Sequence, residues 1–142
     1  MSGVTNTGVV GYISNPVASF PKDSITIDIF GNSFYRNYTY GAGDDTGAYW
    51  NEGEPYSGKV LLFISATIGK ALMGNYSYGN KLRSSRSLDI VVKLPTKNGE
   101  IDFDFIEEFV AELEATRLAE LEAYLEATGL RDYTLTPPRS KP

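Results

Sequence analysis

The feature that most constrains this chain is an uninterrupted helical stretch near its C-terminus. Between Asp104 and Gly129 the sequence contains no proline or glycine, and about 25 residues of helix would extend about 37 Å. Asp104 and Glu107 form a capping-box-like pair, and Asp102 is a second candidate for the N-cap. Gly129 predicts a left-handed stop. We therefore predict a helix over residues 102–128.

One face of this predicted helix is apolar. At about 100° per residue, its apolar side chains fall within a stripe about 120° wide. The stripe contains Ile106, Phe109, Val110, Leu113, Leu121 and Tyr124. A helix this long cannot bury both ends on a small domain, so its distal half is expected to need a partner. Arg117 lies within the stripe. Either its apolar stem packs along the domain while the guanidinium reaches solvent, or the guanidinium pairs with a partner's carboxylate and fixes the register of the two helices.

The segment before the helix predicts a strand and a turn. Leu88 to Pro95 is a short apolar, β-branched run closed by proline, which is typical of a buried last strand. Lys97, Asn98 and Gly99 predict a turn, since Asn and Gly tolerate positive φ. A globule that ends in a strand and continues into one long helix is the expected plan.

Upstream of residue 88, hydrophobic periodicity indicates several short elements. Ser24–Phe30 alternates strictly, with Ile25, Ile27 and Ile29 on one face, and predicts a strand. Residues 34–40 should pair with it as a hairpin. We further predict short strands within 6–14 and over 48–50, and a helix over 59–73 in which Gly69 is a weak point.

These elements predict an α+β fold in which a small domain of twisted β-sheet with short helices precedes one long C-terminal helix suited to coiled-coil pairing. The predicted domains are residues 1–97, a spacer or dimerisation helix over 98–130, and a tail over 131–142.

The composition excludes several kinds of site. Cys and His are absent, which removes thiolate and imidazole metal ligands and any Ser–His or Cys–His nucleophile pair. Asp44, Asp45, Glu52 and Glu54 could bind a cation, but a solvated turn is favoured. No apolar run is long enough to span a membrane and no signal peptide is visible, so the cytoplasm is expected.

Charge is divided unevenly along the chain. Residues 1–99 carry nine Lys and Arg against seven Asp and Glu, whereas residues 100–142 carry four against eleven. The acidity therefore belongs to the helix, where a solvated face is the ordinary explanation. The mildly basic globule neither requires DNA nor excludes it, because DNA affinity depends on local cationic patches.

The loop over residues 74–87 is the best candidate for a binding site. Tyr76 and Tyr78 could stack or form hydrogen bonds, and Asn80 could read adenine. Lys81, Arg83 and Arg86 could neutralise phosphates or read guanine. On composition alone, a merely solvated loop is an equally good interpretation.

Several strings together resemble the specificity subunits of type I restriction–modification enzymes. They are Tyr78-Gly79-Asn80-Lys81, Ile90 to Pro95, and Asn98 to Phe105, in which Leu-Pro precedes Ile-Asp-aromatic at a helix start. Residues 8–13, 34–36 and 111–136 are also similar to segments of that family. The resemblance implies a target-recognition domain that reads half of a bipartite site in double-stranded DNA. It also implies that the long helix pairs with a second such helix and docks methyltransferase subunits.

The resemblance therefore implies a non-catalytic recognition function. Full subunits of the family hold two such domains and two helices, so this chain is expected to be a half-subunit that lacks the usual opening residues before Val4. Its partners would be DNA, methyltransferase and restriction subunits, and a homodimer partner or another specificity half. No cofactor is implied for this chain, since S-adenosylmethionine and ATP would belong to the partner subunits. The alternatives are the C-terminal recognition part of a fused restriction-methyltransferase, and a truncated helix-mediated interaction module without DNA binding.

Overall fold

The computed structural model describes residues 5–9, 11, 19–43, 45–77 and 79–129. The chain divides into two compact units, residues 1–107 and 108–142. The first unit contains a small sheet and its covering helix, and the second begins inside the long helix α3 (Phe103–Thr128). The architecture is α+β, as the sequence predicts.

The sheet is antiparallel and has its longest strand in the middle. Strand β1 (Ser24–Asp28) pairs with β2 (Ser33–Arg36) on one side and with β3 (Thr46–Tyr49) on the other. Ile25 lies opposite Tyr35 in one pair and Tyr49 in the other. The predicted strand over 24–30 and its hairpin are confirmed, and the predicted short strand over 48–50 is observed two residues earlier.

Strand β1 is buried on both of its faces. Ile25 and Ile27 join the apolar core, as expected from their alternation. Ser24 and Thr26, which alternate with these isoleucines, are also buried, and each has a hydrogen-bond partner. Ser24 Oγ lies 2.6 Å from Tyr40 Oη, and Thr26 Oγ1 accepts from Arg36 Nε at 3.0 Å.

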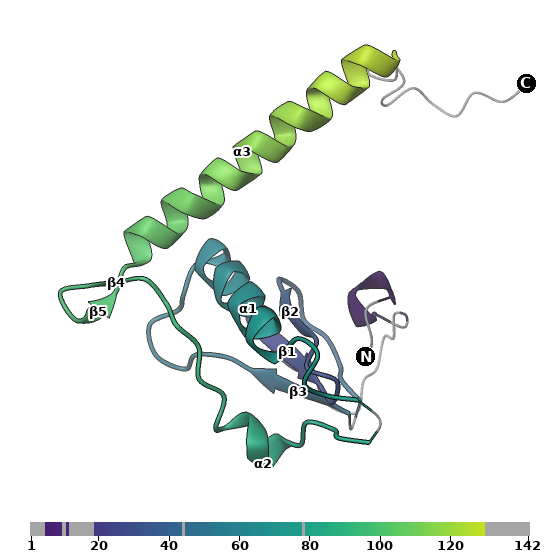
Figure 1. The fold of residues 1–142 in the computed structure, drawn as a ribbon, viewed down its shortest axis with the longest axis vertical. Coiled ribbons are helices and arrows are strands. Elements are labelled where there is room, and N and C mark those ends of the chain that lie inside the picture. Colours follow the sequence, from purple (N-terminus) through teal and green to yellow (C-terminus); the bar gives the residue numbers. More distant parts are fainter. Residues whose placement is uncertain (1–4, 10, 12–18, 44, 78, 130–142) are drawn as a thin grey trace, which may run out of the picture. The chain divides into compact units, whose positions relative to one another are not determined.

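Helix α1 (Gly58–Leu72) covers one face of the sheet and confirms the helix predicted over 59–73 (Figure 1). Ser57 caps it by accepting from the Val60 amide at 3.3 Å. Gly69 does not interrupt the helix, and a Cβ there would lie 3.8 Å from Ser33 Cβ of β2. One cluster of buried apolar residues is formed by Ile25, Ile27, Leu61, Leu72 and Leu82.

The predicted strand over residues 88–95 is wrong. This segment has no strand partner, and Leu88 and Val91 are 82% and 85% exposed. The amides of Asp89 and Ile90 instead donate to Arg86 and Ser87 carbonyls and close a turn. These amides are therefore not available to a sheet ladder, and Pro95 has none to offer. Of the apolar residues in the run, Ile90 packs against the core cluster.

The strand predicted within residues 6–14 is also not observed where the structure describes that stretch. Residues Thr5–Gly8 form the 3₁₀ helix η1, with Thr7 at a φ of 50°. Residues 10 and 12–14 lie outside the described part of the chain. Arg36 Nη2 donates to the Thr7 carbonyl at 2.6 Å, which ties η1 to the sheet.

The entry to α3 follows the predicted signals. Strands β4 (Thr96–Lys97) and β5 (Glu100–Ile101) form a tight hairpin around Asn98 and Gly99, whose φ values are 53° and 82°. Positive φ at both positions is the signature of a type I′ turn. Of the two capping candidates, Asp102 is the cap, since its carboxylate accepts from the Phe105 amide at 3.1 Å, whereas Asp104 lies inside the helix.

Helix α3 ends where the sequence predicts, at Gly129, which has a φ of 74°. In the part of the chain that the structure describes, no helix is apolar and long enough to cross a bilayer.

Candidate nucleic-acid interface

The loop over residues 74–87 is anchored to the sheet at its centre. It leaves α1 through Gly74, which has a φ of 78°. The amide of Leu82 donates to the Ile29 carbonyl just beyond β1 at 2.7 Å, and the Leu82 side chain is buried in the core. The polar residues on either side of Leu82 are therefore presented by a fixed backbone rather than by a freely moving loop.

The end of the loop is anchored as well. Residues Ser84–Ser87 form the short helix α2, with Arg83 as its N-cap residue. Tyr49 Oη of β3 donates to Ser87 Oγ at 2.7 Å, which joins α2 to the edge of the sheet. No single residue in the polar sequence of this segment predicts such a helix, since its serines favour turns and caps over helix interiors.

Three of the predicted site residues come together. The Arg86 guanidinium lies over the Tyr76 ring, 5.8 Å from its centroid. Arg86 Nη1 also donates to Asn80 Oδ1 at 3.4 Å. Asn80 Nδ2 donates to the Asn75 carbonyl at 3.0 Å. Both ends of the Asn80 amide are thus engaged within the loop, whereas bidentate reading of adenine would require both to be released.

The other predicted residues lie apart from this group. Arg83 is exposed at the start of α2, and Lys81 is half-buried beside Leu82. Tyr78 lies outside the described residues.

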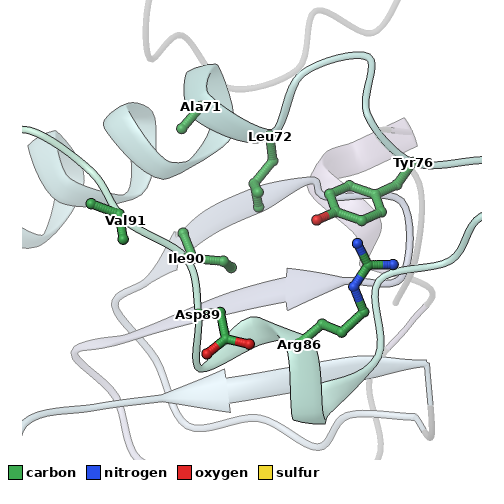
Figure 2. A pocket seen from close by; sticks show the side chains of 7 residues that line it. All are labelled: Ala71, Leu72, Tyr76, Arg86, Asp89, Ile90 and Val91. Carbon is green, nitrogen blue, oxygen red and sulfur yellow. The ribbon is translucent and has the colours of Figure 1, made fainter.

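A hollow opens beside Arg86, with a volume of about 340 Å³. Figure 2 shows Tyr76 and Arg86 side by side on one wall, with Asp89 and Ile90 on the other. Its lining residues are Ala71, Leu72, Tyr76, Arg86, Asp89, Ile90 and Val91. Sequence reasoning missed Asp89 because that residue was assigned to a buried strand. Its position three residues after Arg86, close to a turn, is the signal that could have identified it.

The residues predicted to meet a partner helix differ widely in exposure. Ile106 and Val110 are buried, whereas Leu113, Leu121 and Tyr124 are 50%, 52% and 58% exposed. Phe109 is also exposed. The side chain of Arg117 is 83% exposed, and its Nη1 lies 3.9 Å from Glu120 Oε2. In this structure Arg117 therefore meets solvent.

In the described ranges, no three acidic, Cys or His side chains are grouped to hold a metal ion. Asp44 of the acidic turn is not among the described residues. Among the described tyrosines, two outside residues 74–87 have raised pKa values: burial raises the pKa of Tyr40, and burial together with Asp23 raises the pKa of Tyr35 on β2 to about 12.

The chain is similar to the specificity subunit S.BcgI of a type II restriction enzyme from Heyndrickxia coagulans. The two are 28% identical over 114 residues, which cover 78% of this chain and 33% of that protein. The chain thus spans about a third of the length of the curated relative it matches. No family model and no solved structure matches the chain. The similarity agrees with the expected resemblance to specificity subunits in general, and it does not single out the type I class.

Proposed function

We propose that this chain recognises a specific sequence in double-stranded DNA as part of a restriction–modification complex, while partner subunits carry the catalysis. The observation that carries the proposal is the similarity to a restriction-enzyme specificity subunit over 78% of the chain. Because the chain corresponds to 33% of that protein, we propose that it acts as one half of a recognition assembly.

The geometry of the loop supports this function. Lys81, Arg83 and Arg86 are placed on a segment that Leu82 and Ser87 fix to the sheet. Cations on a rigid support can neutralise phosphates at defined positions, which sets affinity and orientation on the duplex. An aromatic ring and an amide orient one of these cations, Arg86, and an oriented guanidinium can read a base edge as well as a phosphate.

The long helix supports assembly. Its exposed apolar residues, including Leu113, Leu121 and Tyr124, leave a surface that a second helix could cover. We propose that this surface pairs with another specificity half, and that the assembled helices dock methyltransferase and restriction subunits.

The motifs over residues 90–105 favour a type I system. A fused restriction-methyltransferase, in which the same domain follows a catalytic one, is the alternative. The coding sequence around this chain separates them: a type I system requires a separate adenine methyltransferase reading frame beside it, whereas the alternative places the methyltransferase upstream in the same frame.

The function is tested by measuring binding of the full chain to a random duplex library over a series of salt concentrations. We expect enrichment of a defined sequence. Substitution of Lys81, Arg83 and Arg86 by Ala should reduce binding and flatten the salt slope by about one per lost phosphate contact. The matched control replaces three exposed lysines outside this loop, Lys22, Lys93 and Lys97, and should leave the enriched sequence unchanged. Absence of duplex binding would instead support a helix-mediated interaction module.

A further inference from the structure

Arg86 is oriented from two sides, yet most of its donor groups face no protein acceptor. The Tyr76 ring lies under its guanidinium, and Asn80 accepts from Nη1. Within the described ranges, no carboxylate forms an ion pair with Arg86, and no other acceptor takes its remaining N–H groups. The N–H donors of the planar Arg86 guanidinium are therefore held in position and can bind a ligand.

The two groups that hold Arg86 are themselves fixed. Residues Ser77 and Asn80 exchange two backbone hydrogen bonds, at 3.1 and 3.0 Å, and the Asn80 side chain is tied to the Asn75 carbonyl. The Tyr76 ring packs against Gly31, where an added Cβ would lie 3.2 Å from Tyr76 Cδ2. Because its supports cannot move freely, Arg86 loses less conformational entropy when it binds than a free surface arginine would.

Asp89 distinguishes between guanine and phosphate, the two ligands whose acceptor atoms match an arginine guanidinium. Guanine offers O6 and N7, and a phosphate offers two charged oxygens. The Asp89 carboxylate lines the same hollow as Arg86 (Figure 2). A carboxylate there opposes a phosphate, but it can accept from the N4 amino group of the cytosine paired with guanine. The hollow thus favours a neutral base edge.

We infer that Arg86 is a specificity-determining residue that reads a guanine, with Tyr76 and Asn80 as positioning residues and Lys81 and Arg83 directed to phosphates. The inference rests on the proposed DNA-recognition function. It gives the cations of the loop two roles, a base contact for Arg86 and phosphate contacts for Lys81 and Arg83. It gives Asn80 a role that differs from direct reading of adenine.

The test replaces each guanine of the enriched duplex, one at a time, by 7-deazaguanine, which lacks N7. At one of these positions, the substitution should lower the affinity of the native full chain for the duplex by about tenfold or more. Arg86→Gln should lose this sensitivity, and Arg86→Lys should keep only part of it, since lysine keeps a charged donor but not the planar guanidinium. Arg83→Gln is the matched control, and it should weaken binding to all duplexes while keeping the 7-deazaguanine penalty.

The positioning residues are tested by the ratio of the affinities for the unmodified duplex and for the 7-deazaguanine duplex. Tyr76→Phe retains a ring under the guanidinium and should keep the penalty, whereas Tyr76→Leu should reduce it with little change in binding to unrelated duplexes. A purely structural role for Tyr76 would weaken binding to every duplex alike.

Two results would overturn the inference. If Arg86→Gln kept the 7-deazaguanine penalty and only flattened the salt slope, Arg86 would be a phosphate contact. If the native chain enriched no sequence at all, the proposed function would fail together with this inference, so the two failures are distinguishable.

Discussion

Arg36 is a charged residue that lies almost entirely inside the domain, at 1% exposure. Its guanidinium donates to Thr26 Oγ1, to the Thr7 carbonyl and to Tyr38 Oη, and it lies 5.2 Å from the centroid of the Phe34 ring. In the described part of the chain, all of its hydrogen-bond acceptors are uncharged. Arg36 therefore acts as a buried connector between η1 and the sheet.

Replacing Arg36 by Leu should lower the free energy of unfolding by about 3 kcal/mol, because the buried Thr26 hydroxyl and the partly buried acceptors at Thr7 and Tyr38 would lose their donor at once. Urea denaturation measures the loss. Arg83→Leu, at an exposed position, serves as the control and should change stability by no more than about 0.5 kcal/mol. Equal effects of the two substitutions would show that the Arg36 contacts contribute nothing to stability.

Tyr35 gives the domain a dependence on alkaline pH. Its hydroxyl donates to Asp23 Oδ1 at 2.6 Å. Burial, and then the hydrogen bond and charge of Asp23, raise the pKa of Tyr35 to about 12, above its ordinary value of 10.0. A raised pKa in the folded state means that folding favours the neutral phenol. Its stabilising effect is therefore complete below pH 10 and is lost as the pH rises towards 12.

Tyr35→Phe should lower stability at neutral pH by about 1 kcal/mol, since the hydrogen bond to Asp23 is removed. It should also make the fall in stability between pH 10 and 12 shallower. Chemical denaturation at a series of pH values measures both effects, with Tyr124→Phe on the exposed helix surface as the control. Parallel curves for Tyr35→Phe and the native chain would contradict this role of Tyr35.

Among the elements, those with strong local signals were predictable. Strict alternation identified β1, apolar spacing identified α1, and Asp102 and Gly129 marked the ends of α3. Leu88–Pro95 was not predictable, because its β-branched composition says only that the residues suit a pleated surface. The backbone amides of Asp89 and Ile90 were taken by the turn after α2 instead.

The candidate site was predictable in part. Its cations and aromatic residues could be found from composition, whereas the short helix α2 at residues Ser84–Ser87 could not. The contact between Arg86 and Asn80 depends on a turn between residues 77 and 80 and on the anchoring of Leu82. The anchoring of Leu82 to Ile29 is a tertiary contact without a local pattern, so the sequence could not show that the Asn80 amide is engaged.

The cap of α3 gives a prediction at the level of one element. Asp102→Ala should destabilise the helix by about 1 kcal/mol, because the Phe105 amide would lose its acceptor. Asp102→Asn should retain the cap, and Asp104→Ala should have a smaller effect through the helix dipole alone. Circular dichroism during thermal unfolding measures the order of the three. A larger loss from Asp104→Ala would make Asp104 the functional cap.

For the whole molecule, acidic and basic residues are separated along the chain. The acidic residues are concentrated after residue 99, on the helix, whereas residues 1–99 have a slight excess of cations. An acidic helix is a poor surface for DNA, which carries its own dense negative charge. Its exposed apolar residues suit a protein partner, so the two kinds of partner are expected to meet different parts of the chain.

Self-association through α3 follows from this separation. We expect the full chain to form a dimer in sedimentation experiments at about 50 μM, a concentration at which an association with a micromolar Kd is largely complete. A two-fold arrangement suits an isologous contact between identical helices. Substitution of both Leu113 and Leu121 by Asp should give a monomer, because each copy would bury two new charges in the interface.

The matched control introduces the same two charges on the other side of the helix, as Ala115→Asp with Ala119→Asp. At about 100° per residue these positions lie opposite the apolar stripe, and the dimer should persist. If the control also dissociated the dimer, the added charge rather than the stripe would explain the effect. If the native chain were already a monomer at this concentration, the exposed stripe would have to be covered by a different protein.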